Sequence, residues 1–234
     1  MMDDILKKID NAKILSLLRE EDRKELASKA HKKLYFKGEF ICHQDYIWQN
    51  MAFVSSGDVK WTLFSPDGKR QIVFGLEEGS VILGHSLFDG KGMPASLEVI
   101  SDSIVCIWPK EIVMPILLRN ENALLEVMRV LVTNMRRVRN VVYGFSFYRV
   151  PQRLAKLLLD HYNPDEGEIA ARDLTLEIMA AEVGTTRELI SRVLHDFAKE
   201  EIIDISRKNI VFTNKEKLEE IARGTALPFD LKEI

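Results

Sequence analysis

Residues 174–197 read LTLEIMAAEVGTTRELISRVLHDF and carry the clearest structural signal in the chain. Apolar residues recur in it at helical spacing and predict a short helix over 176–183 and a second one over 187–199. The Thr175 hydroxyl can cap the first helix by accepting a hydrogen bond from a free backbone N–H. Gly184 suits the turn that follows, because glycine tolerates a positive φ. A helix, a short glycine turn and a second helix are typical of a helix-turn-helix.

The second helix divides its residues between two faces. It begins in Thr185-Thr186-Arg187-Glu188, which has capping-box spacing. The side predicted to be buried carries Leu189, Ile190, Val193, Leu194 and Phe197. The opposite face carries Arg187, Glu188, Ser191, Arg192 and His195. Such a face can be a merely solvated surface, but arginine can also donate two hydrogen bonds to guanine, and glutamate can accept one from the cytosine amino group. We predict that this face enters the major groove of double-stranded DNA.

A basic hairpin follows the second helix. Residues 202–205 and 210–212 are apolar runs that flank Ser206-Arg207-Lys208-Asn209, so the pattern predicts a β-wing with a basic tip. Contacts to phosphate position a protein on DNA without reading its sequence. The residues predicted to contact the DNA backbone are Thr175, Thr185, Thr186, His195, Arg207 and Lys208.

The sequence pattern before the helix-turn-helix is different. Between Leu34 and Trp108, short runs rich in Val, Ile, Phe and Trp alternate with turn signals such as Ser65-Pro66-Asp67-Gly68. About eight closely spaced strands predict an antiparallel β-roll or jelly roll. The first thirty residues read as helical. The predicted fold class is therefore α+β: an N-terminal antiparallel β-roll, a long helix and a C-terminal winged helix-turn-helix.

A heptad pattern separates the β-rich part from the helix-turn-helix. It consists of Leu124, Met128, Leu131, Met135, Val138, Val142 and Phe145, spaced alternately by four and three residues. The pattern fits a helix packed on its own domain, but its narrowness favours a seam between two parallel helices of a homodimer. The domains expected are a sensor roll over 1–119, a dimerisation helix over 120–148, a DNA-binding domain over 149–223 and a tail over 224–234.

The stretch from Leu174 to Phe212 resembles the winged helix-turn-helix of the Crp/Fnr regulators, and the order of parts agrees over nearly the whole chain. The resemblance implies that Glu188 and Arg192 read bases. Arg187 matches a base-reading arginine of the cyclic-AMP receptor branch, and Ser191 matches the serine of the Fnr branch. A palindromic site with TGTGA-like or TTGAT-like half-sites is expected, and the sequence leaves the choice between them open. An activator of this family would also contact RNA polymerase.

The resemblance also indicates which small molecule the N-terminal domain could bind. In the family's cyclic-nucleotide members, a Gly–Glu pair holds the ribose and an Arg–Ser pair holds the cyclic phosphate. Here His85 follows Gly84, and Pro94 or Ala95 stands in place of the arginine, so cyclic AMP is not expected to bind. An unidentified small effector is expected between roll and helix. Its predicted lining is Phe74, Leu83, Gly84, His85, Ser86, Ser96, Met128, Asn134 and Met135.

Composition excludes several other classes. The only cysteines, Cys42 and Cys106, cannot supply the four ligands of an iron–sulfur cluster. Isolated histidines argue against haem and against a metal-dependent enzyme, although a haem-based gas sensor stays an alternative, as does a sensor module that regulates a protein partner. No secretory signal and no membrane-spanning run is present, so a cytoplasmic, non-enzymatic protein is expected. With a net charge of -3, DNA binding must depend on a local surface.

Overall fold

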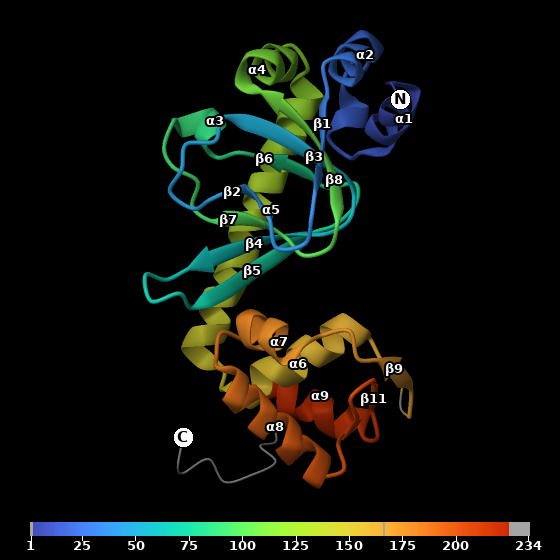
Figure 1. Ribbon diagram of the computed structural model, residues 1–234, viewed down its shortest axis with the longest axis vertical. Helices are drawn as coiled ribbons and strands as arrows, with labels where there is room; N and C mark the ends of the chain where they lie inside the picture. Colours follow the sequence, from blue (N-terminus) through green and yellow to red (C-terminus); the bar gives the residue numbers. More distant parts are fainter. Residues whose placement is uncertain (1, 166, 225–234) are drawn as a thin grey trace. The chain divides into compact units, whose positions relative to one another are not determined.

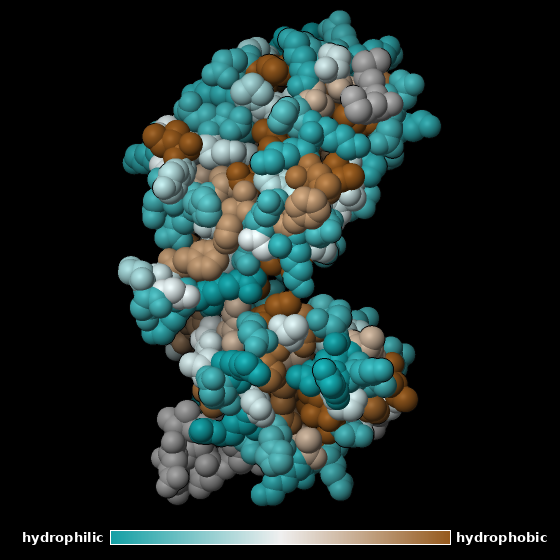
Figure 2. Space-filling view, viewed as in Figure 1, coloured by the Kyte–Doolittle hydropathy of each residue, from teal (hydrophilic) through white to brown (hydrophobic). Residues whose placement is uncertain are grey.

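The computed structural model describes residues 2–165 and 167–224. The chain forms two compact units, and the division between them falls after Val138, within a long helix. Side chains on the face shown in Figure 2 are mostly hydrophilic, as expected where apolar side chains fill interior cores. Among the described residues, none of the helices combines the length and the hydropathy that a membrane span requires.

The N-terminal unit opens with short helices rather than one long one: α1 (Met2–Asn11), the 3-10 helix η1 (Leu15–Leu17) and α2 (Glu20–Ser28). Acidic residues occupy the first turn of both α-helices, where the helix dipole favours negative charge. Ile5, Ile9 and Leu26 are buried and pack these helices against the β-rich part.

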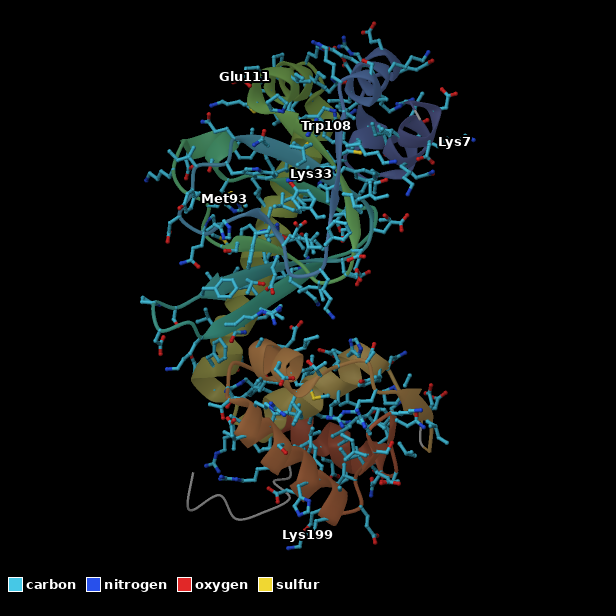
Figure 3. The ribbon with its side chains drawn as sticks, in the orientation of Figure 1. Lys7, Lys33, Met93, Trp108, Glu111 and Lys199 are labelled. Carbon is cyan, nitrogen blue, oxygen red and sulfur yellow. The ribbon has the colours of Figure 1, made fainter. Side chains whose placement is uncertain are left out.

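Two four-stranded antiparallel sheets form the predicted β-roll (Figure 1). Their orders are β1-β8-β3-β6 and β2-β7-β4-β5. The strands are β1 (His31–Tyr35), β2 (Phe40–Cys42), β3 (Asn50–Ser56), β4 (Val59–Phe64), β5 (Arg70–Leu76), β6 (Val81–Leu83), β7 (Ser96–Val99) and β8 (Ser103–Pro109). The short helix α3 (Ser86–Asp89) follows β6. Trp108 of β8, labelled in Figure 3, is fully buried, and its indole N–H donates to the Leu26 carbonyl at 2.8 Å, which ties α2 to the sheet.

Helices α4 (Lys110–Leu118) and α5 (Glu121–Phe147) follow the roll. Asn120 lies between them, and its buried amide accepts from the Arg19 backbone N–H at 3.0 Å and donates to the Asp22 carboxylate at 2.6 Å. Arg119 also donates to Asp22, at 2.8 Å from Nε, and this hydrogen bond lowers the pKa of the Asp22 carboxyl group. These bonds fix the start of α5 against the N-terminal helices. Because α5 belongs to both compact units, the boundaries at 119 and 148 stay predictions.

The C-terminal unit is a winged helix-turn-helix, so the predicted fold class is confirmed. Its core includes Leu158, Phe197 and Phe212, which are fully buried. Its elements are α6 (Val150–Tyr162), β9 (Ile169–Ala171), α7 (Leu176–Val183), α8 (Arg187–Lys199), β10 (Asp204–Ile205), β11 (Asn209–Val211) and α9 (Lys215–Arg223). The tail predicted over 224–234 lies outside the described residues except for Gly224.

Candidate DNA interface and sensor cavity

The turn between α7 and α8 is built from side-chain caps and one glycine. The Thr175 hydroxyl accepts from the Ile178 N–H at 3.2 Å, and Gly184 ends α7 with φ of 70°. The Thr186 hydroxyl then accepts from the Leu189 N–H at 3.3 Å and begins α8. Each threonine pairs one of the backbone N–H groups that a helix start leaves free. The turn therefore fixes the direction in which α8 leaves α7.

Helix α8 has one buried face and one exposed face. The buried side chains are Ile190, Val193, Leu194 and Phe197, while Leu189 is half-buried. The exposed side chains are Arg187, Glu188, Ser191, Arg192 and His195. The four predicted base-reading residues thus lie together on the first two turns, and Lys199, labelled in Figure 3, marks the far end of the helix. A free polar face of this composition can offer donors and acceptors to base edges.

The charged side chains on this face of α8 differ in their interaction partners. Arg187 Nη1 lies 3.1 Å from Glu177 Oε1, an exposed ion pair between the first turns of α8 and α7. Arg192 forms no ion pair with any residue that the structure describes. The Glu188 carboxylate accepts hydrogen bonds from its own backbone N–H and from the Thr186 hydroxyl, which lower its pKa. Glu188 is therefore held as an anion at the N-terminus of α8 and can only accept hydrogen bonds.

The wing presents the predicted basic tip on a three-stranded sheet. Strands β10 and β11 pair across a turn in which the Ser206 hydroxyl accepts from the Asn209 N–H at 3.0 Å. Arg207 and Lys208 at the tip are exposed. Sequence reasoning missed the third strand, β9, because three residues are too short for a periodic signal. It also missed Arg172, which follows β9 and donates to the Ser206 carbonyl at 3.1 Å, adding a cation to the wing.

Inside the β-roll, aromatic side chains fill most of the space where an effector was predicted. Trp61 stacks on Phe74 with ring centroids 5.0 Å apart, and the His85 ring centroid lies 4.9 Å from that of Trp61 in a tilted arrangement. Together with Leu83 and Asn134 they leave an inner cavity of only about 10 Å³, enough for one water molecule at most. Burial lowers the pKa of His85, which disfavours its charged form. Trp61 was not among the residues predicted to line the effector pocket, although its inward position follows from strand alternation in β4.

The remaining residues of the predicted effector pocket lie elsewhere. A Cβ on Gly84 would meet the Trp48 carbonyl oxygen at 2.4 Å, so the glycine is required by packing. The Ser86 hydroxyl accepts from the Trp48 N–H at 3.0 Å and donates to the Lys91 carbonyl at 2.6 Å, and the Ser96 hydroxyl accepts from the Gln44 N–H at 2.9 Å. These hydroxyls are engaged in holding loops.

Met128 and Met135 do not line the inner cavity, because they are 52% and 73% exposed. They belong to an apolar stripe on α5 whose frame differs in part from the predicted seam. Leu124 is half-buried, and Leu131 packs against the core of the N-terminal unit. Their exposed counterparts are the next residues along the helix, Leu125 and Val132. The exposed stripe therefore consists of Leu125, Met128, Val132, Met135 and Val142, while Val138 and Phe145 of the predicted seam are exposed beside it.

Comparison with known families accounts for both parts of the chain. Residues 32–120 match the family model of the cyclic nucleotide-binding domain, and residues 152–221 match that of the Crp-like helix-turn-helix domain. Together the two models cover about two thirds of the chain.

The chain belongs to the Crp/Fnr family of transcription regulators. It is 27% identical to the CRP-like cAMP-activated global transcriptional regulator of Mycobacterium tuberculosis over 178 residues, which are 74% of this chain and 80% of the relative. It is 26% identical to the cyclic AMP receptor protein of Thermus thermophilus over 195 residues, which are 83% of this chain and 89% of the relative. A crystal structure described as a Crp/Fnr-family transcriptional regulator of Eubacterium rectale has a similar fold, with a TM-score of 0.75, 20% identity and coverage of 90% of this chain and 98% of that one.

Two features distinguish the sensor domain of this Crp/Fnr regulator. Among the described residues that line its inner cavity, none is a lysine or an arginine, and His85 is the single titratable side chain. Ala95, one of the two candidates for the position of the phosphate-binding arginine, is buried in the core of the roll. A cyclic phosphate in this cavity would therefore meet no cationic side chain.

Proposed function

We propose that this Crp/Fnr regulator binds a palindromic promoter site as a homodimer and reads its bases with Arg187, Glu188, Ser191 and Arg192. The observation that carries the proposal is the exposed face of α8, where all four side chains lie free of the core on a helix capped against α7. Thr175, Thr185, Thr186, His195, Arg207 and Lys208 would bind the phosphates and set the register. Two such helices about 34 Å apart would reach successive major grooves on one side of a duplex.

The exposed apolar stripe on α5 supports the homodimer. Its first four members recur every three or four residues and Val142 follows Met135 by seven, which is one heptad of a coiled-coil seam. A stripe of this kind in water favours pairing with an identical stripe, because pairing removes apolar surface from solvent. The proposed interface shares Met128, Met135 and Val142 with the seam predicted from the sequence. It takes the exposed Leu125 and Val132 in place of Leu124 and Leu131, and Val138 and Phe145 lie beside it.

We further propose that a small effector other than cyclic AMP controls DNA affinity. The absence of a cation from the lining of the inner cavity, in the part of the chain that the structure describes, supports this restriction. An effector acts only through its different affinities for the DNA-competent and DNA-incompetent arrangements of the dimer. In this proposal the regulator acts in the cytoplasm and catalyses no reaction. At promoters that it activates, it would contact RNA polymerase.

The test is selection of binding sites from random duplex DNA, combined with sedimentation of the free protein. A two-fold symmetric consensus and a dimeric mass are expected. A consensus without symmetry, or a monomer with no preferred sequence, would contradict the proposal.

The α5 stripe has its own variant. Met135→Glu places a charge at its most exposed member and is expected to give monomers that bind the selected site at least about 100-fold more weakly, because burying an unpaired carboxylate is costly. Leu118→Glu at the end of α4, also exposed, is the matched control and should leave both properties unchanged. A dimeric Met135→Glu protein would exclude the stripe as the interface.

A further inference from the structure

A second, larger cavity lies on the N-terminal unit, outside the roll. This outer groove measures about 280 Å³ and is bounded by the segment after α1, the turn between β5 and β6, and α5. Its floor is apolar and consists of Ile14, Leu76, Val81 and Val130. Leu76, Val81, Val130 and Asn134 also line the inner cavity, so one layer of side chains separates the two spaces.

The rim of the outer groove carries three cations, Lys13, Arg129 and Arg137. One carboxylate organises two of them: Glu126, whose side chain is 6% exposed, has Oε1 at 2.7 Å from Lys13 Nζ and Oε2 at 3.0 Å from Arg129 Nη1. The side chains of Lys13 and Arg129 are nevertheless 80% and 70% exposed, so most of their surface stays open to a ligand.

Arg137 is held by an aromatic ring instead of a carboxylate. Its guanidinium carbon lies 5.4 Å from the centroid of the Phe74 ring, a cation–π contact that directs the side chain toward the roll. Within the described ranges, Arg137 has no acidic partner. Three cations therefore line the outer groove, two of them share the Glu126 carboxylate, and no carboxylate is among the described residues that line it. Of the two carboxylates in the turn beside the groove, Glu77 and Glu78, the second pairs with Lys8.

One side of the outer groove faces away from the apolar stripe. Arg137 follows Met128 by nine residues, which is two and a half helical turns and places the two side chains on opposite sides of α5. Arg129 follows Leu125 by four residues and therefore lies beside the stripe. A partner helix on the stripe would leave the Arg137 side of the groove open.

We propose that the outer groove binds a phosphorylated small molecule, with its phosphoryl group between Arg129, Arg137 and Lys13 and its apolar part on the floor. A phosphate monoester carries nearly two negative charges at neutral pH, which suits the cations of the rim. Arginine suits phosphate because its planar fork donates paired hydrogen bonds. The apolar floor selects an ester over inorganic phosphate. This site is separate from the inner cavity and from α8. A failure to bind the phosphate ester would therefore not contradict the proposed DNA binding, and the reverse also holds.

The experiment is calorimetric titration of the full chain at pH 7.5 with phenyl phosphate as the probe. Phenyl sulfate has the same shape and one negative charge, and inorganic phosphate has the charge without the ring. Phenyl phosphate is expected to bind about tenfold more tightly than either, which corresponds to one charge-assisted hydrogen bond or to burial of the ring. No saturable heat with phenyl phosphate, or equal affinity for the sulfate, would overturn the proposal.

Variants locate the site. Arg137→Gln is expected to weaken phenyl phosphate binding about tenfold, and Lys13→Gln to weaken it to a lesser extent. Arg136→Gln is the matched control, because Arg136 is an exposed arginine on α5 that does not line the groove. Circular dichroism and thermal unfolding verify that each variant is folded, and Lys13→Gln serves if Arg137→Gln is not. Equal loss in Arg136→Gln and in the groove variants would show diffuse charge attraction and contradict the site.

Discussion

The exposed face of α8 and the inner cavity of the β-roll differ in the exposure of their side chains to solvent. On α8, the side chains of Arg187, Glu188, Ser191, Arg192 and His195 are exposed, and the apolar side chains behind them hold the helix in the core. In the roll, Trp61, Phe74 and His85 occupy the interior and leave about 10 Å³. A surface can be prepared for a ligand by rigid backbone alone, whereas an interior must exchange its own side chains for the ligand. The two regions should therefore respond differently to substitution.

The largest effect is expected in the roll. Trp61→Ala removes a side chain that is 7% exposed and leaves a cavity next to Phe74, so it should lower the free energy of unfolding by about 3–5 kcal/mol. Urea denaturation measures the change, and Trp61→Phe, which keeps a ring on Phe74, should lose less than about half as much. Indole should restore part of the stability of Trp61→Ala by filling the cavity. Equal stabilities of wild type and Trp61→Ala would show that the stack does not hold the roll closed.

The next effect is on α8. Arg192→Ala should weaken binding to the selected site by about 1–3 kcal/mol and relax one base position, because Arg192 is free of ion pairs among the described residues and available to a guanine. Lys208→Ala at the wing tip should weaken all sequences about equally and flatten the salt dependence. Gel-shift titrations on matched and mismatched duplexes at two salt concentrations separate the two. Identical behaviour would remove the distinction between base reading and phosphate contact.

A smaller effect is expected from Glu177, the partner of Arg187. Glu177→Gln removes a carboxylate beside the proposed DNA surface and frees Arg187, so affinity for non-specific DNA should rise by a factor of about two to five, typical of an exposed ion pair. Specific binding should rise less, because Arg187 loses its fixed position. Fluorescence anisotropy on both kinds of duplex gives the ratio. Glu216→Gln on α9 is the control, because Glu216 is an exposed carboxylate that is not the ion-pair partner of Arg187. The same ratio in both variants would contradict the role of the pair.

The smallest effect is expected for cyclic AMP binding to the inner cavity of the roll. Calorimetric titration with cyclic AMP should give no saturable heat, because the inner cavity offers no room and no lysine or arginine among the described residues that line it. Wild type and Trp61→Ala should behave alike, since the larger cavity still lacks a cation. Tight binding of cyclic AMP to either protein would show that the roll opens and recruits a charge from elsewhere.

Much of the fold was predictable because its signals are local. Helices α7 and α8 were predicted with the bounds that the structure gives, since Thr175, Gly184 and Thr186 mark their ends chemically. Strand β9 was missed, because three residues are too few to show a period. The dimer seam stays a prediction, and the exposed apolar stripe of α5 differs from it at Leu124 and Leu131, because the core of the N-terminal unit partly covers that side of the helix.

The order of the residues alone determined that the chain has a helix-turn-helix with a polar, exposed face, since caps, turn glycine and helical period all act within a few positions of one another. It did not determine the filling of the roll or the outer groove. Trp61, Phe74 and His85 come from β4, β5 and the link between β6 and α3. Lys13, Ser80 and Arg137 come from the segment after α1, the turn between β5 and β6, and α5. Which of these side chains meet, and what volume they leave, depends on the pairing of strands far apart in the chain, and only the folded structure fixes that pairing.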